Sequence, residues 1–275
     1  MSLTSPRPKF RNILPDTFSA FIFPAFAHDY SEHPVTGHAE FMKYFASFLA
    51  SGASQVDPVL ADFDFERNNF LDDELRTQYI TYIFSCAASA VLRKSHFVPV
   101  TTAGFSMGIY AALFDAGAIS FGTGLDLIRL AFHCLKDTLK GARFGMGTII
   151  GLGREDIEQL ISRPGLRIEI TNRSAPYSFV VSGADDDIVR ILESARLEGA
   201  LHTRDLGVSL PYHSGYLLQG SLEFEKMISG LEFGPPANPI QSLIDQAILD
   251  TGESLRKEVV RNLHHPLNWL ETQRR

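Results

Sequence analysis

The stretch HFVPVTTAGFSMGIYAALFDAGA, residues 96–118, decides the fold because it places G-x-S-x-G between a strand-like run and a helix-like run. His96 to Ala103 predict a short buried strand, and Ile109 to Ala118 predict a helix. A sharp turn between them strains its corner residue, and flanking glycines let neighbouring backbone pass closely. Ser106 would then stand at a helix N-terminus, where free N–H groups stabilise an oxyanion. The motif indicates a nucleophilic serine, although ordinary turns also match it.

The composition is that of a globular chain. Its 275 residues, 45% hydrophobic and 21% charged, allow one large domain or two smaller ones. A net charge of −7 without a basic stripe argues against nucleic-acid binding, and no run of about 18 apolar residues predicts a membrane span. Cys86 and Cys134 lie in apolar helix-like stretches, so we expect buried reduced thiols in a cytoplasmic protein, with a disulfide as the lesser alternative.

The apolar stretch FSAFIFPAFA, residues 18–27, could be mistaken for a signal peptide because basic residues precede it and Ala25-Phe26-Ala27 imitates a cleavage site. Pro24 interrupts the run, and the chain has no disulfide framework. We therefore predict a first core strand here.

Strand and helix patterns alternate along the chain, which predicts an α/β fold with a mainly parallel sheet. Outside the motif, the first part has a strand at residues 20–23 and helices at 40–50, 71–94 and 120–140. Between residues 141 and 206 the order is β-α-β-β-α-β, with strands at 146–152, 166–172, 178–183 and 201–207 and helices at 154–163 and 185–199. That order is typical of a ferredoxin-like unit. The remainder, from Ser209, predicts helix, a short strand at 240–244 and a terminal helical region.

A nucleophilic serine needs a base, and His213 is the best placed of the nine histidines. It lies in GVSLPYHSGYL, residues 207–217, where Pro211 stops an extended run and a helix begins. His133 lies on an apolar helix, so we expect it in the core or between helices. The other seven lie in polar or loop-like segments. Spacing alone leaves the role of His213 open.

These segments together resemble the malonyl-CoA:acyl-carrier-protein transacylases and the acyltransferase domains of fatty-acid and polyketide synthases. GFSMGIYAALFDAGAISF, residues 104–121, is similar to the family's GHSLGEYAAL-x-x-AG-x-x-x-F, and VSLPYHSGYL is similar to the segment around its catalytic histidine. ITNRSAPYSFVVSG and LHHPLNW match two further segments. The resemblance covers nearly the whole chain. It implies an α/β hydrolase-like domain formed by residues 1–140 and 207–275, with a ferredoxin-like insert at 141–206.

The resemblance also implies a two-step acyl transfer. Ser106, activated by His213, would attack an acyl-CoA thioester, and the acyl-serine would pass its acyl group to the phosphopantetheine thiol of an acyl carrier protein. Backbone N–H groups of Met107 and Phe26 would hold the oxyanion. Backbone carbonyls rather than a carboxylate would orient the histidine. We expect no metal and no bound cofactor.

Departures from the family pattern bear on the acyl group. Phe26 and Phe105 replace polar family residues, and Ala131 stands where the family has the arginine that binds the malonyl carboxylate. Each charge-assisted hydrogen bond of such an arginine contributes about 1.5–3 kcal/mol. Arg129 points to roughly the opposite face of the helix and is expected to be a surface or salt-bridging residue. Asn262 aligns with a late family glutamine.

Three hypotheses stay open at this point. Phe26, Phe105, Ala131 and Phe132 would give an apolar pocket, which favours transfer of an uncharged acyl group. A hydrolase that clears stalled acyl groups from carrier proteins suits Ala131 equally well. A non-catalytic carrier-binding subunit would explain the altered motifs but not the retention of both Ser106 and His213. The family continues into a final strand, whereas this chain ends at Arg275, so truncation and a different sheet edge both remain possible.

Overall fold

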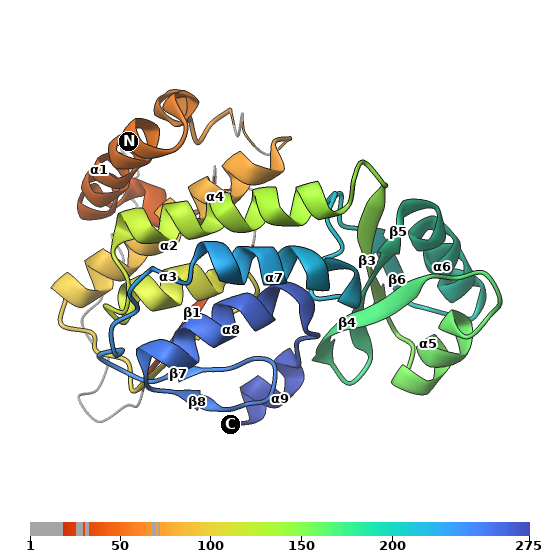
Figure 1. Cartoon of the computed structure of the whole chain (residues 1–275). Helices are drawn as coiled ribbons and strands as arrows, with labels where there is room; N and C mark the ends of the chain where they lie inside the picture. Colours follow the sequence, from red (N-terminus) through yellow and green to blue (C-terminus); the bar gives the residue numbers. More distant parts are fainter. Residues whose placement is uncertain (1–18, 26–29, 31–32, 68–69, 71) are drawn as a thin grey trace, which may run out of the picture.

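A computed structural model of the chain describes residues 19–25, 30, 33–67, 70 and 72–275. Their strands form two separate four-stranded sheets with helices around them, which confirms the predicted α/β class (Figure 1). In the first sheet the order is β1-β2-β7-β8, and in the second it is β4-β5-β3-β6. No helix in this part of the chain is both long and apolar enough to cross a membrane.

The first sheet carries the G-x-S-x-G turn. Strands β1 (Ala20–Phe23), β2 (Thr101–Gly104) and β7 (Ile240–Gln241) run parallel, and β8 (Ile248–Leu249) pairs antiparallel with β7. Phe23 is in register with Gly104, so β1 and β2 end at the same edge of the sheet. The segment after β1 and the turn after β2 therefore begin side by side.

Helices surround this sheet and form the main core. They are α1 (Ala39–Gln55), α2 (Glu74–Lys94), α3 (Gly108–Asp115), α4 (Phe121–Thr138), α7 (Leu218–Met227) and α8 (Gly252–His264), with short 3-10 helices at Pro34–Gly37, Pro58–Asp62 and Gly215–Leu217. Helix α3 packs against β1 and β2, and α2, α4 and α8 contact α3 from the other sides (Figure 1). Tyr79, Ile83 and Ala87 of α2 are buried, as their helical spacing predicts.

The second sheet belongs to the β-α-β-β-α-β segment. Its elements are β3 (Phe144–Ile150), α5 (Arg154–Ile161), β4 (Ile168–Ala175), β5 (Ser178–Ala184), α6 (Asp185–Leu197) and β6 (His202–Asp205). All its strand pairs are antiparallel, and α5 and α6 lie together beside it (Figure 1). A second apolar core, which includes Ile149, Phe179 and Ile188, lies between the sheet and these helices.

Backbone hydrogen bonds join the second sheet to the end of the chain. The N–H of Leu267 donates to the Thr171 carbonyl at 2.9 Å, and the N–H of Arg173 donates to the Leu267 carbonyl at 3.1 Å. The terminal helix α9 (Trp269–Arg274) contacts β4 next to this point. Strand β4 is therefore held by a segment that lies nearly a hundred residues later in the chain.

Three expectations about local structure were wrong, and one strand was missed. The strand predicted over 96–103 begins only at Thr101, because the preceding residues cross the surface, where Val98 is 69% exposed. His133 is exposed rather than interhelical. Both cysteines are free, which excludes the disulfide, but Cys134 is only half-buried. Strand β8 was not predicted, since a two-residue strand carries no periodic signal.

Candidate active site

The turn after β2 has the strained geometry that the motif predicts. Ser106 has a φ of 55°, in the left-handed region that non-glycine residues rarely occupy. A Cβ atom at Gly104 would lie 2.3 Å from the Cα of Ile109, and one at Gly108 would lie 2.3 Å from the Phe23 carbonyl oxygen. Only glycine fits at either position, because backbone atoms cannot withdraw as side-chain ends can.

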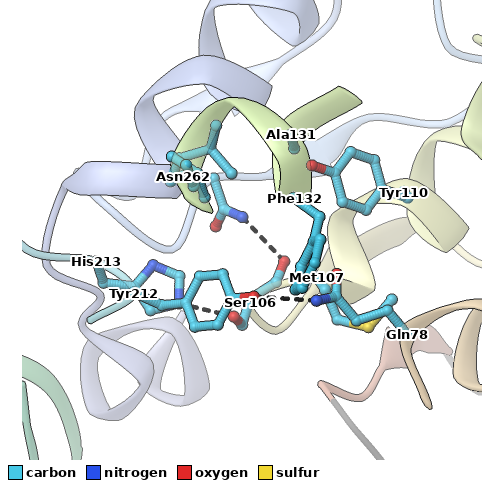
Figure 2. A pocket seen from close by; sticks show the side chains of 11 residues that line it. Gln78, Ser106, Met107, Tyr110, Ala131, Phe132, Tyr212, His213 and Asn262 are labelled. Carbon is cyan, nitrogen blue, oxygen red and sulfur yellow. Dashed lines mark hydrogen bonds between the residues drawn. The ribbon is translucent and has the colours of Figure 1, made fainter. Parts of the chain in front are cut away.

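Ser106 and His213 meet although 107 residues separate them in the sequence. The distance from Ser106 Oγ to His213 Nε2 is 2.7 Å (Figure 2). His213 is 4% exposed and also has a left-handed backbone, with a φ of 63°. Its N–H donates to the Leu263 carbonyl at 2.9 Å, which fixes the backbone of this turn against the end of α8. Serine and imidazole therefore stand at the distance a general base requires.

Burial keeps the His213 ring neutral. Loss of contact with water lowers the pKa of His213 to about 4, and the backbone carbonyl of Asn262 opposes this shift only in part. Among the described residues, Nδ1 has no partner that meets ordinary hydrogen-bond geometry. When Nδ1 carries the ring proton, the Ser106 hydroxyl can donate to Nε2. A neutral imidazole in that tautomer can accept the serine proton across the whole neutral range.

One carboxylate holds the loop that carries His213. Glu74, in the first turn of α2, accepts hydrogen bonds from the Ser209 N–H at 3.0 Å, the Ser209 hydroxyl at 2.6 Å and the Tyr212 hydroxyl at 2.8 Å. Tyr212 is also held from the second sheet, because the Ser182 hydroxyl donates to its carbonyl at 3.1 Å. His213 is thus positioned by contacts to α2, α8 and β5, and no carboxylate of the described residues bonds its ring.

The start of α3 offers a donor for an oxyanion. Within the described residues, the N–H of Met107 makes no hydrogen bond, and it follows the serine directly. The N-terminal end of a helix adds a favourable partial positive charge. Phe26, the second predicted oxyanion residue, lies outside the described residues.

A narrow cavity adjoins Ser106. It is lined by Gln78, Ser106, Met107, Tyr110, Ala131, Phe132, Leu135, Tyr212, His213, Asn262 and Leu263 (Figure 2). The cavity has a volume of about 20 Å³. It opens into about 350 Å³ of unfilled space that extends to solvent. Such a cavity holds about one water as it stands, so it suits a small group.

No arginine or lysine in the described part of the chain lines the cavity. Arg129 is 43% exposed and donates to Asp126 at 3.0 Å, as expected for a surface residue. Ala131 lines the cavity. Phe105 does not, because its ring packs against Trp269, with the ring centroids 5.4 Å apart. No lining residue within the described ranges thus offers a cation to a substrate carboxylate, and Phe105 does not contribute to the apolar wall of the cavity.

Asn262 lines the cavity and also bonds the turn that carries Ser106. Its side-chain N–H donates to the Ser106 carbonyl at 3.1 Å, and the residue is 6% exposed. The Asn262 amide, which is shorter than the family's glutamine, thus bonds α8 to the strained turn at Ser106. Its backbone carbonyl faces the His213 ring, so one residue contacts both members of the pair.

Sequence reasoning missed three polar residues of the cavity. Gln78 Nε2 donates to the Tyr212 hydroxyl at 3.0 Å, and both residues line the cavity. The hydroxyl of Tyr110 lines it without a hydrogen-bond partner among the described residues. The only signal was position: Tyr212 precedes the histidine, and Tyr110 lies one helical turn after the serine.

A wider hollow of about 590 Å³ lies outside this cavity. Phe132 lines both spaces, and Lys136 stands over the Phe132 ring, 5.4 Å from its centroid. Asp72, Asp73 and Glu74 line the hollow as well. The hollow and the cavity beside Ser106 thus share Phe132 as a wall.

Comparison with known proteins identifies relatives in polyketide biosynthesis, although no protein-family model matches the chain. The polyketide biosynthesis malonyl CoA-acyl carrier protein transacylase PksC of Bacillus subtilis is 30% identical over 183 residues, covering 66% of this chain and 62% of that protein. The polyketide biosynthesis protein ThaF of Burkholderia thailandensis is 29% identical over 207 residues, covering 74% of this chain and 18% of that protein. The chain thus spans less than two thirds of the length of these relatives.

Solved structures show the same fold. An acyl-carrier-protein S-malonyltransferase from Burkholderia pseudomallei superposes with a TM-score of 0.82 at 23% identity, covering 94% of this chain and 85% of that one. A malonyl-transacylase solved in complex with a type II polyketide-synthase acyl-carrier protein gives a TM-score of 0.81 at 23% identity, covering 93% and 84%. The resemblance read from the sequence motifs is confirmed, and the fold is that of the malonyl-CoA:acyl-carrier-protein transacylases.

Proposed function

We propose that this chain is a serine acyltransferase that moves a small uncharged acyl group from CoA to the phosphopantetheine thiol of an acyl carrier protein. The single observation that carries the proposal is the contact of 2.7 Å between Ser106 Oγ and the buried, neutral His213. The relatives named as transacylases, and the relative solved with a carrier protein, support the reaction class.

The first step loads the serine. His213 Nε2 takes the Ser106 hydroxyl proton as Oγ bonds to the thioester carbon, and the carbonyl electrons move onto oxygen. The Met107 N–H stabilises this oxyanion. When the oxyanion collapses, the carbon–sulfur bond breaks, and the imidazolium returns its proton to the CoA thiolate. The products are acyl-Ser106 and free CoA.

The second step reverses these roles with a new thiol. His213 removes the proton from the pantetheine thiol of the carrier protein, and the thiolate attacks the acyl-serine carbon. Collapse of the second oxyanion breaks the ester bond, and the proton goes back to Ser106 Oγ. The pantetheine arm would approach through the outer hollow beside Phe132.

The absence of a cation among the described lining residues is the reason for proposing an uncharged acyl group. A carboxylate taken from water into this cavity would lose its hydration without gaining an ion pair. An acyl group without a charge has no such cost. The acyl group that we propose is therefore not malonyl, although PksC is named as a malonyl transacylase.

Intact-protein mass spectrometry tests the proposal. The chain is incubated with acetyl-, butyryl- or malonyl-CoA and then with a phosphopantetheinylated carrier protein, with Ser106→Ala as the control. We expect acetyl or butyryl adducts on Ser106 that move to the carrier. Preferential malonyl loading would contradict the uncharged acyl group. Release of free acid from acyl-carrier protein without loading from CoA would instead identify a hydrolase.

A further inference from the structure

The hydroxyl of Tyr110 is a buried donor that nothing in the described part of the chain satisfies. Tyr110 is 2% exposed, and its hydroxyl oxygen has no hydrogen-bond partner among the described residues. Two other buried tyrosines do have partners: the Tyr82 hydroxyl donates to the Phe121 carbonyl at 3.1 Å, and the Tyr212 hydroxyl donates to Glu74 at 2.8 Å. Because leaving a buried hydroxyl unpaired is unfavourable, its position requires an explanation.

This hydroxyl lies in the cavity that adjoins the nucleophile. Tyr110 and Ala131 both line the cavity, and the ring directs its oxygen toward Ala131 (Figure 2). Burial raises the pKa of Tyr110, so the phenol stays protonated at neutral pH and can donate. A neutral donor therefore stands beside the position that lacks the family's arginine.

We propose that Tyr110 recognises an uncharged oxygen on the third carbon of the acyl group, so that the substrate class is 3-oxoacyl or 3-hydroxyacyl rather than simple alkyl acyl. The inference rests on the proposed acyl transfer at Ser106. The thioester oxygen must stay at Met107, so an oxygen directed toward Ala131 needs at least one carbon between them. The narrow cavity favours the shortest chain that meets this requirement.

An acetoacetyl group fits this description and allows a test with matched substrates. Replacing its terminal methyl group by an anionic oxygen gives malonyl, and replacing its 3-oxo oxygen by hydrogen atoms gives butyryl. The three thioesters have similar size and differ in charge or in the single acceptor. Chain length is therefore controlled. Because the 3-oxo group also makes the thioester carbon more electrophilic, only the part of the preference that depends on Tyr110 reports recognition of that oxygen.

The experiment measures the rate of Ser106 acylation of the full chain by acetoacetyl-, butyryl- and malonyl-CoA, using intact mass. We expect acetoacetyl to exceed butyryl by about tenfold, the effect of one buried hydrogen bond, and malonyl to be slowest. In Tyr110→Phe the acylation rates with acetoacetyl-CoA and butyryl-CoA should differ by no more than about twofold. Tyr82→Phe, which removes a buried hydroxyl outside the cavity lining, should leave the acetoacetyl-to-butyryl ratio unchanged.

Several results would overturn the inference and are distinguishable. Butyryl loading equal to or faster than acetoacetyl, or an unchanged ratio in Tyr110→Phe, would exclude recognition by Tyr110 while leaving acyl transfer intact. A lower midpoint of thermal unfolding for Tyr110→Phe would show that the hydroxyl has an internal partner. No loading by any of the three thioesters would overturn the proposed function itself.

Discussion

Burial of His213 should make the protein less stable in mild acid by an amount that can be calculated. The unfolded histidine takes up a proton as the pH falls through 6.5, whereas the folded one stays neutral until about pH 4. Between these values the unfolded chain binds more protons, so the free energy of unfolding falls as the pH falls. Above pH 7 both forms are neutral, and this contribution vanishes.

The two pKa values give the magnitude. Protonation of the unfolded histidine at pH 5 lowers the free energy of unfolding by about 2 kcal/mol relative to pH 7, and the loss approaches about 3 kcal/mol below pH 4. His213→Asn removes the titrating ring. Asparagine is a suitable replacement because the backbone here has a φ of 63°, which asparagine tolerates better than most residues.

Urea unfolding followed by circular dichroism at pH 7 and pH 5 provides the measurement for both proteins. Carboxylates and the exposed histidines titrate in both and cancel, so the quantity of interest is the difference between the two pH-dependent losses. We expect wild type to lose about 2 kcal/mol more than His213→Asn. Equal losses would refute the claim that the folded site keeps its histidine neutral by excluding water.

Three substitutions test other parts of the site. Glu74→Gln should slow acylation of Ser106 about tenfold in stopped-flow assays, because a neutral amide accepts the Ser209 and Tyr212 hydrogen bonds more weakly; an unchanged rate would show that the carboxylate does not position the base. Gly108→Ala should lower the free energy of unfolding by about 2 kcal/mol or more, since its Cβ would lie 2.3 Å from the Phe23 carbonyl; a variant with wild-type stability in urea contradicts this. Asn262→Leu should reduce the acylation rate by a few-fold, because the Ser106 carbonyl loses a hydrogen bond worth about 1 kcal/mol.

Local patterns along the chain were sufficient to predict much of this molecule. The two glycines around Ser106 predicted a sharp strand-to-helix turn, because such a turn brings neighbouring backbone too close for a side chain at either position. The order of short elements predicted the second sheet, whose strand pairing follows from that order. Ser106 and His213 were selected by motif and come together in the structure, while their catalytic roles stay proposals.

Long-range packing could not be predicted in the same way. Glu74 contacts the loop of His213 across 135 residues or more, and a glutamate in a first helical turn is ordinary without that contact. Phe105 was expected beside the substrate because it replaces a polar residue of the family's serine motif, but its ring packs against Trp269. Val98 looked like a buried strand residue, yet burial depends on what covers a segment, which local pattern does not specify.

The bonds between Leu267 and β4, together with the Ser182 contact to Tyr212, have a consequence for recombination between related enzymes. A chimera that exchanges only the second sheet would place foreign residues against Tyr212 and Leu267, which hold the His213 loop and the terminal helix. The working module to transplant is the second sheet with residues 206–217 and 262–269 attached. Gly104 and Gly108 would remain with the host sheet, because their close contacts are to α3 and β1.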